Sequence, residues 1–377
     1  MLEVAEIFRL QGESFRASHS LAPWQEKAMA DIEHCRTAYF GGHLERCDRC
    51  GHEHYSYHSC RNRHCPKCHG EQTQAWLEKQ QARLLPTDYY LLTFTLPASL
   101  RSLAHTHPRE VYDLLMKSAV AALQKLAADP QWVGGTLPAL AVLHTWTRAL
   151  LFHPHVHILV PAGGVSAEGA WVEAKHPHFL VPGYALSEIF RAKIKAGLKE
   201  LGLLDPVCPC WSQKWNVHCR HAGSGIEVLN YMGRYLFRVA ISNSRLEEFE
   251  NGQVTFKYRD NQTQQPRRLT LSADQFIERF LQHVLPKGFV KVRTYGLWSA
   301  AQKERLLQIQ QTFAASVQEA WQLIQAALAA LPPDSVPQGP GLEFIDSPPP
   351  DSTLCSKCKS GHMIFVREIA PQRNRPP

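Results

Sequence analysis

Hydrophobic and polar residues alternate along this chain with two different periods. Helix-like spacing of apolar positions predicts helices over residues 1–34, 72–85, 109–128, 187–201, 223–237, 272–284 and 299–331. Segments rich in β-branched and aromatic residues predict strands over residues 88–97, 138–146, 155–161, 213–219, 253–260, 265–272 and 289–296. A short connection separates the second and third strands, which indicates an antiparallel pair. This order predicts an α+β fold with a mainly antiparallel central sheet and helices against one face.

Shifts in composition divide the chain into five consecutive parts. A helical, Cys/His-rich domain is expected over residues 1–85, because Pro86 stops the helix that precedes it. The α+β domain is expected over residues 86–298. The remaining parts are a long helix, a proline-rich linker and a cysteine-containing tail, over residues 299–331, 332–350 and 351–377.

Composition and charge narrow the class of protein. The chain has 377 residues, of which 44% are hydrophobic, and this is typical of a globular protein with a large core. No apolar run approaches the roughly 18 residues of a membrane-spanning helix, and the N-terminus lacks a secretory signal pattern. We therefore expect a cytoplasmic protein without a membrane partner. Residues 251–310 carry ten Lys/Arg against four Asp/Glu, which suits either a surface that faces a polyanion or a merely solvated basic face.

Four of the eleven cysteines have the spacing of a zinc site. Cys47 and Cys50 form one C-x-x-C pair, and Cys65 and Cys68 form another after fourteen intervening residues. Two such turns are typical of a zinc ribbon, in which four thiolates surround one ion. The alternative is a set of buried or incidental cysteines, but a reducing compartment favours metal ligation over disulfides. The spacing therefore predicts structural Zn²⁺ at Cys47, Cys50, Cys65 and Cys68.

Further residues of the metal-ligating type surround these pairs. A second zinc ion is predicted at Cys35, His43, Cys60 and His64, and the alternative is that the histidines are ordinary surface residues. The C-terminal segment offers three ligands and no evident fourth, so it either borrows one or binds nothing: Cys355, Cys358 and His362. The other three cysteines are expected to be ordinary thiols: Cys208, Cys210 and Cys219.

A histidine pair and a tyrosine pair carry the candidate chemistry. His155 and His157 stand two apart in a predicted strand, so both imidazoles point to one face and can hold a divalent ion, unless the spacing arose by chance. Tyr231 and Tyr235 stand four apart in a predicted helix and share a face, which plain packing would also explain. Two arginines of the same helix are candidates for contacts with flanking phosphates: Arg234 and Arg238.

Together these pairs describe a site for phosphoryl transfer. A metal held by histidines polarises a DNA phosphate, and a tyrosine attacks it to give a covalent phosphotyrosine and a free 3′-hydroxyl. The charge of the metal also stabilises the pentacoordinate transition state. A second tyrosine on the same face allows a second strand transfer before the first strand is released.

Several long runs of this sequence resemble one group of transposases. The runs are GGHLERCDRCGHEHYSYHSCRNRHCPKC, AVLHTW, HPHVHILVPAGG, LNYMGRYLFRVAISNSRL and FIERFLQHVLPKGFVKVRTYG. They resemble the HUH transposases of insertion-sequence family 91 and its ISCR relatives, over residues 31–295. The resemblance implies an N-terminal zinc-binding domain and an HUH endonuclease core. Such an enzyme cuts and joins single-stranded DNA at element ends during rolling-circle-like transposition.

The resemblance also assigns individual residues. It implies that His155 and His157 are the HUH ligands of a catalytic Mg²⁺ or Mn²⁺ ion. Tyr231 and Tyr235 match the paired tyrosines, and we favour Tyr235 for the first cleavage. The four cysteines of the first predicted zinc site match those of the zinc-binding domain.

The HUH class generally has a third polar metal ligand, which the motif itself does not locate. His144 is our candidate because it lies on the predicted strand that precedes the histidine pair. His153 competes with it, and a histidine that is hydrogen-bonded inside the sheet is the alternative.

The sequence thus predicts a metal-dependent transposase that acts on single-stranded DNA, and two other functions compete with it. A plasmid replication initiator or relaxase would share the histidine and tyrosine chemistry, but the preceding zinc cluster favours a transposase. A non-enzymatic zinc protein would only bind nucleic acid. The chain has no P-loop motif, so we expect a host helicase or replication itself to supply strand unwinding.

Overall fold

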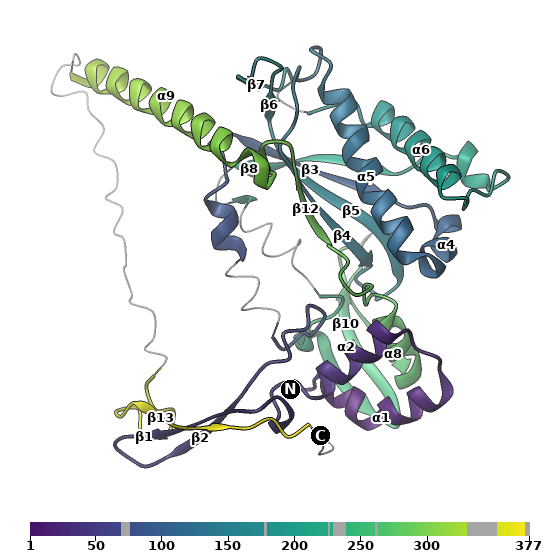
Figure 1. Ribbon diagram of the computed structural model, residues 1–377, viewed down its shortest axis with the longest axis vertical. Coiled ribbons are helices and arrows are strands. Elements are labelled where there is room, and N and C mark those ends of the chain that lie inside the picture. Colours follow the sequence, from purple (N-terminus) through teal and green to yellow (C-terminus); the bar gives the residue numbers. More distant parts are fainter. Residues whose placement is uncertain are drawn as a thin grey trace. The chain divides into compact units, whose positions relative to one another are not determined.

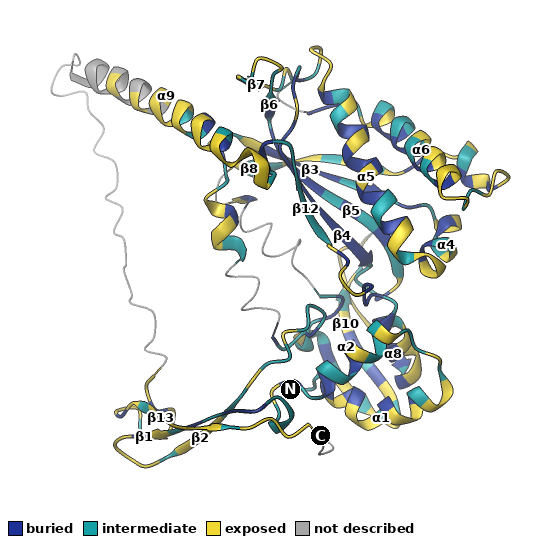
Figure 2. Cartoon of the chain, viewed as in Figure 1, coloured by how far each residue is buried: buried dark blue, intermediate teal, exposed yellow. Residues whose placement is uncertain are grey.

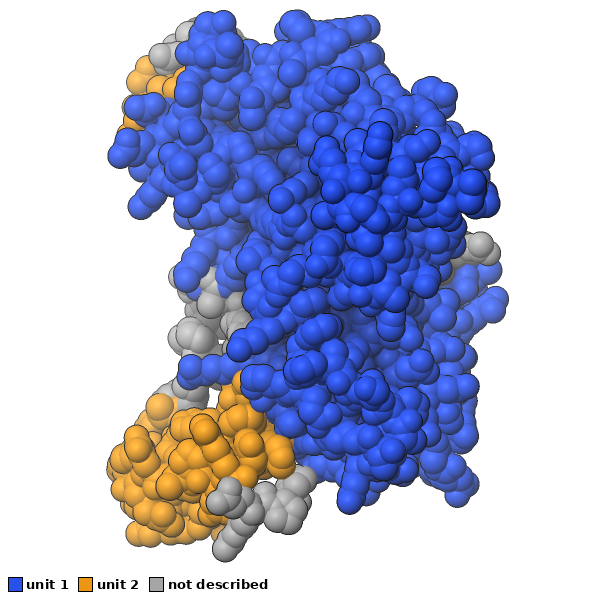
Figure 3. Space-filling model, turned by 45° about the vertical axis from the view of Figure 1, so that its right-hand side comes forward, with its two compact units in different colours: residues 1–33, 61–309 blue, residues 34–60, 310–377 orange. Residues whose placement is uncertain are grey.

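The computed structural model describes residues 1–68, 76–176, 179–224, 227–228, 239–260, 263–329 and 353–373. The chain forms two compact units, which Figure 3 shows in different colours: residues 1–33 with 61–309, and residues 34–60 with 310–377. Each unit therefore combines segments that are distant in the sequence. This differs from the consecutive domains expected from composition, because strands near the N-terminus pair with a strand near the C-terminus.

The first unit is built around a five-stranded antiparallel sheet with the order β12-β4-β5-β3-β8. Its strands are β3 (Asp88–Thr95), β4 (Ala139–Trp146), β5 (Phe152–Pro161), β8 (Val217–Ser224) and β12 (Val292–Tyr295). The helices of this unit are α1 (Val4–Ser18), α2 (Pro23–Glu33), α4 (Arg101–Thr106), α5 (Pro108–Ala127), α6 (Gly183–Glu200) and α8 (Ala273–Leu281). The predicted α+β fold with a mainly antiparallel central sheet is confirmed.

The structure also contains two smaller sheets and a long helix. The three-stranded sheet has the order β11-β10-β9, with β9 (Leu246–Glu250), β10 (Gln253–Arg259) and β11 (Pro266–Ser272). The two-stranded sheet joins β6 (Gly163–Val165) and β7 (Trp171–Glu173). The long helix is α9 (Lys303–Ala329).

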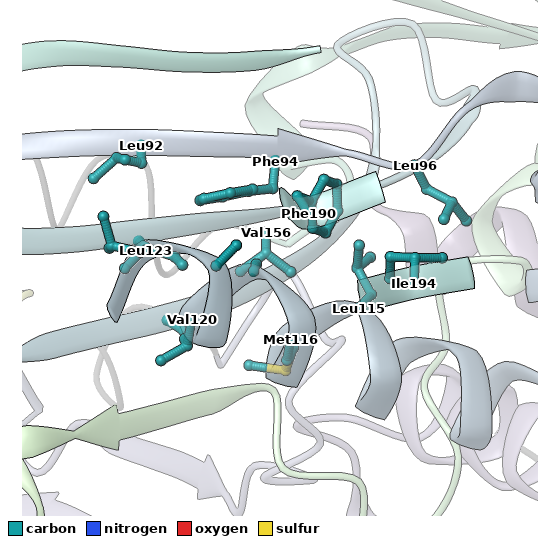
Figure 4. Close-up of a cluster of buried hydrophobic side chains, with 14 of the residues drawn as sticks. Leu92, Phe94, Leu96, Leu115, Met116, Val120, Leu123, Val156, Phe190 and Ile194 are labelled. Atoms are coloured by element: carbon teal, nitrogen blue, oxygen red, sulfur yellow. The ribbon is translucent and has the colours of Figure 1, made fainter. Parts of the chain in front are cut away.

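One face of the central sheet carries the main hydrophobic core. Figure 1 shows α5 and α6 running along this face. Leu92 and Phe94 of β3 and Val156 of β5 project from the sheet toward Leu123 of α5 and Phe190 of α6 (Figure 4). These side chains are fully buried, and the rings of Phe94 and Phe190 meet edge to face at 5.0 Å. Burial of each such side chain stabilises the fold by about 2–3 kcal/mol, so this layer holds the sheet to its helices.

The opposite face of the central sheet is more polar toward one end of its strands. Successive side chains of a strand point to opposite faces, so the residues between the core positions of β5 include His155 and His157. Farther along the same face, Leu159 and Val142 are also buried. Figure 2 shows that most of β4 is buried, whereas buried and half-buried residues alternate in the first part of β5. The sheet therefore places a polar cluster next to an apolar surface.

The N-terminal segment forms two helices, where the sequence predicted a single helix over residues 1–34. Helix α1 ends at Ser18, and α2 begins at Pro23. Proline has no backbone N–H and fits only the first turn of a helix, so a new helix begins there. Phe8 of α1 packs edge to face on Phe280 of α8 at 5.2 Å.

The helix predicted to start at Ser272 is present as α8. Its capping box is also present: the Ser272 side chain accepts from the Gln275 backbone N–H, and the Gln275 side chain accepts from the Ser272 backbone N–H. Strand β8 begins at Val217 and extends to Ser224, later than the predicted strand over residues 213–219. The sequence did not predict β9 or α4, which are only five and six residues long.

The second unit contains a three-stranded sheet with the order β13-β1-β2. Its strands are β1 (Gly42–Cys47), β2 (Glu53–Tyr57) and β13 (Met363–Ile369). Strand β1 pairs antiparallel with both neighbours, so it lies in the middle. Five of the seven residues of β13 are exposed, and this sheet buries little apolar surface.

Replacement of Phe94 by alanine tests the packing of the central sheet on its helices. We expect F94A to lower the free energy of unfolding by about 3–5 kcal/mol, because it leaves a cavity between β3 and α6. The measurement is urea unfolding of the full chain. Tyr184 of α6 is 68% exposed, so Y184A should stay within about 0.5 kcal/mol of the unmodified protein. Equal losses in both variants would contradict this account of the core.

Candidate metal centres and nucleic-acid surface

Three histidines converge on the face of the central sheet opposite α5 and α6. His155 and His157 alternate along β5 with Val156, whose side chain enters the core on the other face. Antiparallel register places His144 of β4 directly opposite His155. One ring nitrogen from each of the three lies within 4.8 Å of the others. Three convergent imidazoles can bind one transition-metal ion and leave coordination positions open for a substrate.

Hydrogen bonds orient two of these rings. His155 Nδ1 donates to the backbone oxygen of His153 at 2.7 Å. His157 Nδ1 and Thr93 Oγ1 are 3.0 Å apart. The carbonyl partner requires His155 Nδ1 to carry the proton, which leaves its Nε2 with a lone pair for a metal, and the Thr93 contact fixes the direction of the His157 ring.

Burial keeps the imidazoles of His155 and His157 neutral. It lowers the pKa of His155 to about 4 and, with further contributions from His155 and Arg220, lowers that of His157 to about 3. A protonated imidazole cannot ligate a metal, so neutral rings at physiological pH are the form that a metal site requires. The three rings also contact one another, with His144 and His157 at a centroid distance of 4.8 Å.

His153 lies beside this cluster with a different partner. Its Nδ1 accepts a hydrogen bond from the Arg101 guanidinium at 2.7 Å, and burial together with this charge lowers its pKa. The group of convergent nitrogens contains His144 and does not contain His153. The geometry therefore favours His144 over His153 as the third ligand.

Two supporting residues of this site were not identified from the sequence. Thr93 reaches His157 from the neighbouring strand β3, with which His157 is paired directly. Trp146 stacks on the His144 ring at a centroid distance of 4.7 Å. The sequence shows that Thr93 lies on a buried strand. Only the pairing of β3 with β5 shows that it lies beside the histidine pair.

The part of the predicted helix that carries the catalytic candidates falls outside the residues that the structure describes. This concerns four predicted site residues: Tyr231, Tyr235, Arg234 and Arg238. Their position relative to the three histidines therefore stays a prediction.

The cysteines are grouped differently from the predicted zinc site. The Sγ atoms of Cys47 and Cys50 lie together with those of Cys355 and Cys358, all within 4.8 Å of one another. The proposed set of Cys47, Cys50, Cys65 and Cys68 is therefore wrong as one site. The cysteines near the C-terminus, for which the sequence suggested no fourth ligand, supply the missing pair.

The β1–β2 hairpin explains this correction. Cys47 and Cys50 lie at its turn, whereas Cys35 and Cys60 flank its open end, where Gly42 pairs with Tyr57. A strand of six residues spans about 20 Å, so cysteines at opposite ends of β1 cannot share one ion. The fourteen residues between Cys50 and Cys65 include strand β2, which leads the chain away from the turn that holds Cys47 and Cys50.

The two histidines of the second predicted set have partners within their own units. His43 lies 3.4 Å from the Glu45 carboxylate, and His64 Nε2 accepts the Leu285 backbone N–H at 3.2 Å. A second zinc ion at Cys35, His43, Cys60 and His64 therefore stays a prediction.

A basic pocket in the first unit is a candidate surface for nucleic acid. It has a volume of about 470 Å³ and is lined by Arg148, Arg245, Lys257, Tyr258, Arg259, Gln264 and Pro266. Four of these side chains are cationic and the lining contains no acidic residue. The Arg245 guanidinium donates to the backbone oxygens of Lys257 and Arg148, which ties β10 to the β4–β5 connection. The sequence showed the basic excess of this region but not the pocket.

Among the described helices, we found none whose length and apolar character would let it cross a membrane.

Two family models match the chain. A model described as a transposase zinc-binding domain matches residues 7–96, and one described as a putative transposase matches residues 139–305. The first covers the N-terminal cysteines, and the second covers all three histidines. The protein is thus a transposase with a zinc-binding domain.

Two curated relatives that match most of the chain identify its family. A putative transposase, y4qJ, of Sinorhizobium fredii is 41% identical over 328 residues, which cover 81% of this chain and 82% of the relative. The transposase of insertion sequence element IS801 from Pseudomonas savastanoi pv. phaseolicola is 30% identical over 287 residues, covering 70% of this chain and 67% of the relative. The chain belongs to the transposases of insertion-sequence family 91.

A search of solved structures found a likeness to a metal-bound conjugative relaxase, TrwC, in complex with oriT DNA. The two chains are 14% identical, with a TM-score of 0.26, over 60% of this chain and 70% of the relaxase chain. A TM-score this low does not establish a common fold.

Replacement of Thr93 by valine tests the orientation of the candidate metal ligand His157. We expect T93V to weaken Mn²⁺ binding by about 10- to 100-fold, because the valine cannot hold His157 Nδ1. The measurement is calorimetric titration of the full chain with Mn²⁺. T95V makes the same change two residues along β3 and should bind as the unmodified protein does, because His155 Nδ1 is held by a backbone oxygen instead. Identical affinities in T93V and T95V would refute the role of Thr93.

Proposed function

We propose that this transposase cuts and rejoins single-stranded DNA at the ends of its element as a metal-dependent HUH endonuclease. The observation that supports this most directly is the convergence of three imidazoles on one sheet face, where burial keeps those of His155 and His157 neutral. Hydrogen bonds also orient two of the rings for a metal: His155 Nδ1 donates to a carbonyl and leaves Nε2 available, and Thr93 holds the His157 ring.

Under this proposal His144, His155 and His157 hold one divalent cation. When bound, the cation supplies Lewis acidity to a DNA phosphate. Imidazole ligands suit transition metals, whereas Mg²⁺ prefers oxygen ligands, so these three residues favour Mn²⁺ over Mg²⁺. Burial keeps His155 and His157 unprotonated, and hydrogen bonds orient their rings, so the geometry of these two ligands is set before DNA binds.

Tyrosine supplies the nucleophile in the proposed reaction. The phenolate oxygen of Tyr235, and in a second step that of Tyr231, forms a bond to phosphorus. The bond between phosphorus and the 3′-oxygen breaks, and this oxygen takes up a proton to become a free 3′-hydroxyl. The product is a 5′-phosphotyrosine, and attack by a 3′-hydroxyl reverses the step and rejoins the strand. The amino-acid sequence supports the two tyrosines, which stand four residues apart.

The basic pocket beside β10 is proposed to hold the DNA backbone. Its side chains include Lys257 and Arg259 on β10 and Arg148 on the connection between β4 and β5. Since β4 and β5 also carry the three histidines, one rigid sheet supports both the metal ligands and part of this pocket. Arg234 and Arg238 are proposed to contact the phosphates that flank the scissile one. A host helicase is expected to supply the single strand.

The covalent intermediate gives the decisive test. We incubate the full chain with labelled single-stranded element ends and Mn²⁺, and map any tyrosine peptide that carries DNA. The expected adduct is on Tyr235 or Tyr231, and Y231F/Y235F should abolish it. The exposed Tyr184 provides the control, because Y184F should leave the adduct unchanged. Cleavage that persists in Y231F/Y235F would exclude this chemistry, and a chain that binds DNA without cutting it would be a non-enzymatic zinc protein.

Loss of a metal ligand should separate cleavage from binding. We expect H155A to abolish cleavage while the protein still binds single-stranded DNA, because the ring holds the cation rather than the DNA. The measurements are nicking of a labelled strand and fluorescence anisotropy of the same strand. Unchanged nicking by H155A would refute the assignment of the metal site.

Salt dependence tests the basic pocket. Each phosphate contact on a single strand contributes about 0.7 to the slope of log affinity against log salt, so K257A/R259A should reduce the magnitude of that slope by about 1.4. The control K195A/K199A removes two positive charges from α6, away from the pocket, and should leave the slope unchanged. An unaltered slope in K257A/R259A would show that the DNA runs elsewhere.

A further inference from the structure

Two C-x-x-C turns from opposite ends of the sequence meet in the second unit. The Sγ atoms of Cys47 and Cys358 are 3.7 Å apart, and those of Cys50 and Cys355 are 3.8 Å apart. Cys47 and Cys355 are fully or almost fully buried. These separations are far longer than the roughly 2.05 Å of a disulfide bond, so the four residues are close without being cross-linked.

The sulfur separations fit a tetrahedral zinc site. Zinc holds thiolates at about 2.3 Å, and a regular tetrahedron with this radius has edges of about 3.8 Å. The two measured edges agree with this value, and the other sulfur pairs lie within 4.8 Å. Four cysteine sulfurs without a carboxylate among them form a ligand set that selects zinc over magnesium or calcium.

The two turns have the same backbone design. Cys47 accepts at its backbone oxygen from the N–H of Gly51, and Cys355 accepts in the same way from Lys359. Gly51 and Lys359 both have positive φ, 71° and 55°. A backbone N–H also points at a sulfur in each turn, from Cys50 to Cys47 Sγ and from Gly361 to Cys358 Sγ. Such donors stabilise thiolates. A non-glycine residue at positive φ is uncommon, so the conformation of Lys359 indicates that the surrounding contacts hold this turn in one shape.

The contacts between the turns fix their relative position. The Asp48 backbone N–H donates to the His362 oxygen at 3.1 Å, and the His362 N–H donates to Asp48 Oδ1 at 2.9 Å. Beyond these residues β13 pairs with β1 from Cys47 to Gly42. At Gly361 a Cβ atom would stand 2.6 Å from Cys47 Sγ, so the approach of the two turns requires glycine there.

This small sheet lacks the apolar burial that would hold it together by itself. Ile364 and Phe365 of β13 are 54% and 59% exposed. Three short strands without a covered hydrophobic face are marginal in water, and small domains of this kind gain stability from a bound metal.

We propose that Cys47, Cys50, Cys355 and Cys358 bind one zinc ion that fastens the C-terminal strand β13 to the N-terminal hairpin. The matched zinc-binding family model covers residues 7–96 and therefore includes only half of these ligands. Under this proposal the zinc-binding domain is completed by the far end of the chain, and loss of the C-terminal tail destroys a zinc site near the N-terminus. The proposal is independent of the nuclease chemistry.

Zinc content of the purified full chain tests the shared site. Relative to the unmodified protein, C47S/C50S and C355S/C358S should each lose about one zinc ion per chain. The variant with all four substitutions should also lose only about one, because both pairs serve the same ion. S356A/K357A changes two exposed residues between the C-terminal ligands and should keep the full zinc content. Elemental analysis by mass spectrometry gives the stoichiometry without any DNA.

Two results would overturn the proposal. If C355S/C358S retains all of its zinc, the tail provides no ligand. If the fourfold variant loses about two ions, each pair belongs to a separate site. Neither result depends on cleavage activity, so a failure here is distinguishable from failure of the proposed nuclease function.

Two variants that keep four potential ligands distinguish loss of the zinc site from misfolding of the protein. In cobalt-substituted protein, C358H should shift the ligand-field absorption from that of four thiolates toward that of three thiolates and one imidazole. G361A keeps every cysteine but should release zinc to a chelator faster, because its Cβ crowds Cys47 Sγ. A C358H spectrum identical to that of the unmodified protein, or unchanged zinc release by G361A, would contradict the assigned geometry.

Discussion

The antiparallel register of β4 with β5 is the constraint on which the candidate active site depends. Pairing of His144 with His155 brings three imidazoles to one point, and the alternation of the strand turns Val156 to the other face. A slip of one residue would exchange the two faces, placing imidazoles in the hydrophobic core and valine at the site. The packing of Val156 against α5 and α6 therefore enforces the register that the chemistry needs.

The same burial that stabilises the central sheet also keeps His155 and His157 in the neutral form that can bind a metal. Removal from water lowers the pKa of His155 and His157, so both rings remain neutral through the physiological range. The second unit differs in this respect. Its small sheet exposes most of β13, and we propose that zinc bound by four converging thiolates takes the place of a hydrophobic core. The transposase thus combines a unit held by packing with a unit proposed to be held by zinc.

Much of the fold could be predicted because it is encoded locally. The strand pattern of residues 138–146 and 155–161 corresponds to β4 and β5, and the capping box at Ser272 marks the start of α8. Short elements such as β9 escaped prediction, because five residues carry too little periodicity. The break before Pro23 was missed because the apolar spacing continues across it. Family 91 membership was also visible in the sequence, since its motifs are long contiguous runs.

For the sites, the sequence by itself determined which residue types were available and which share a face over short distances, as with His155 and His157. It also identified Cys47 with Cys50, and Cys65 with Cys68, as pairs of zinc ligands, and left the role of Cys355 and Cys358 open. Only the tertiary structure decided which turns are partners, because every such turn has the same local geometry and the choice depends on long-range strand pairing. Cys47 and Cys50 have Cys355 and Cys358 as neighbours because β13 returns to β1, whereas strand β2 leads the chain away from their turn.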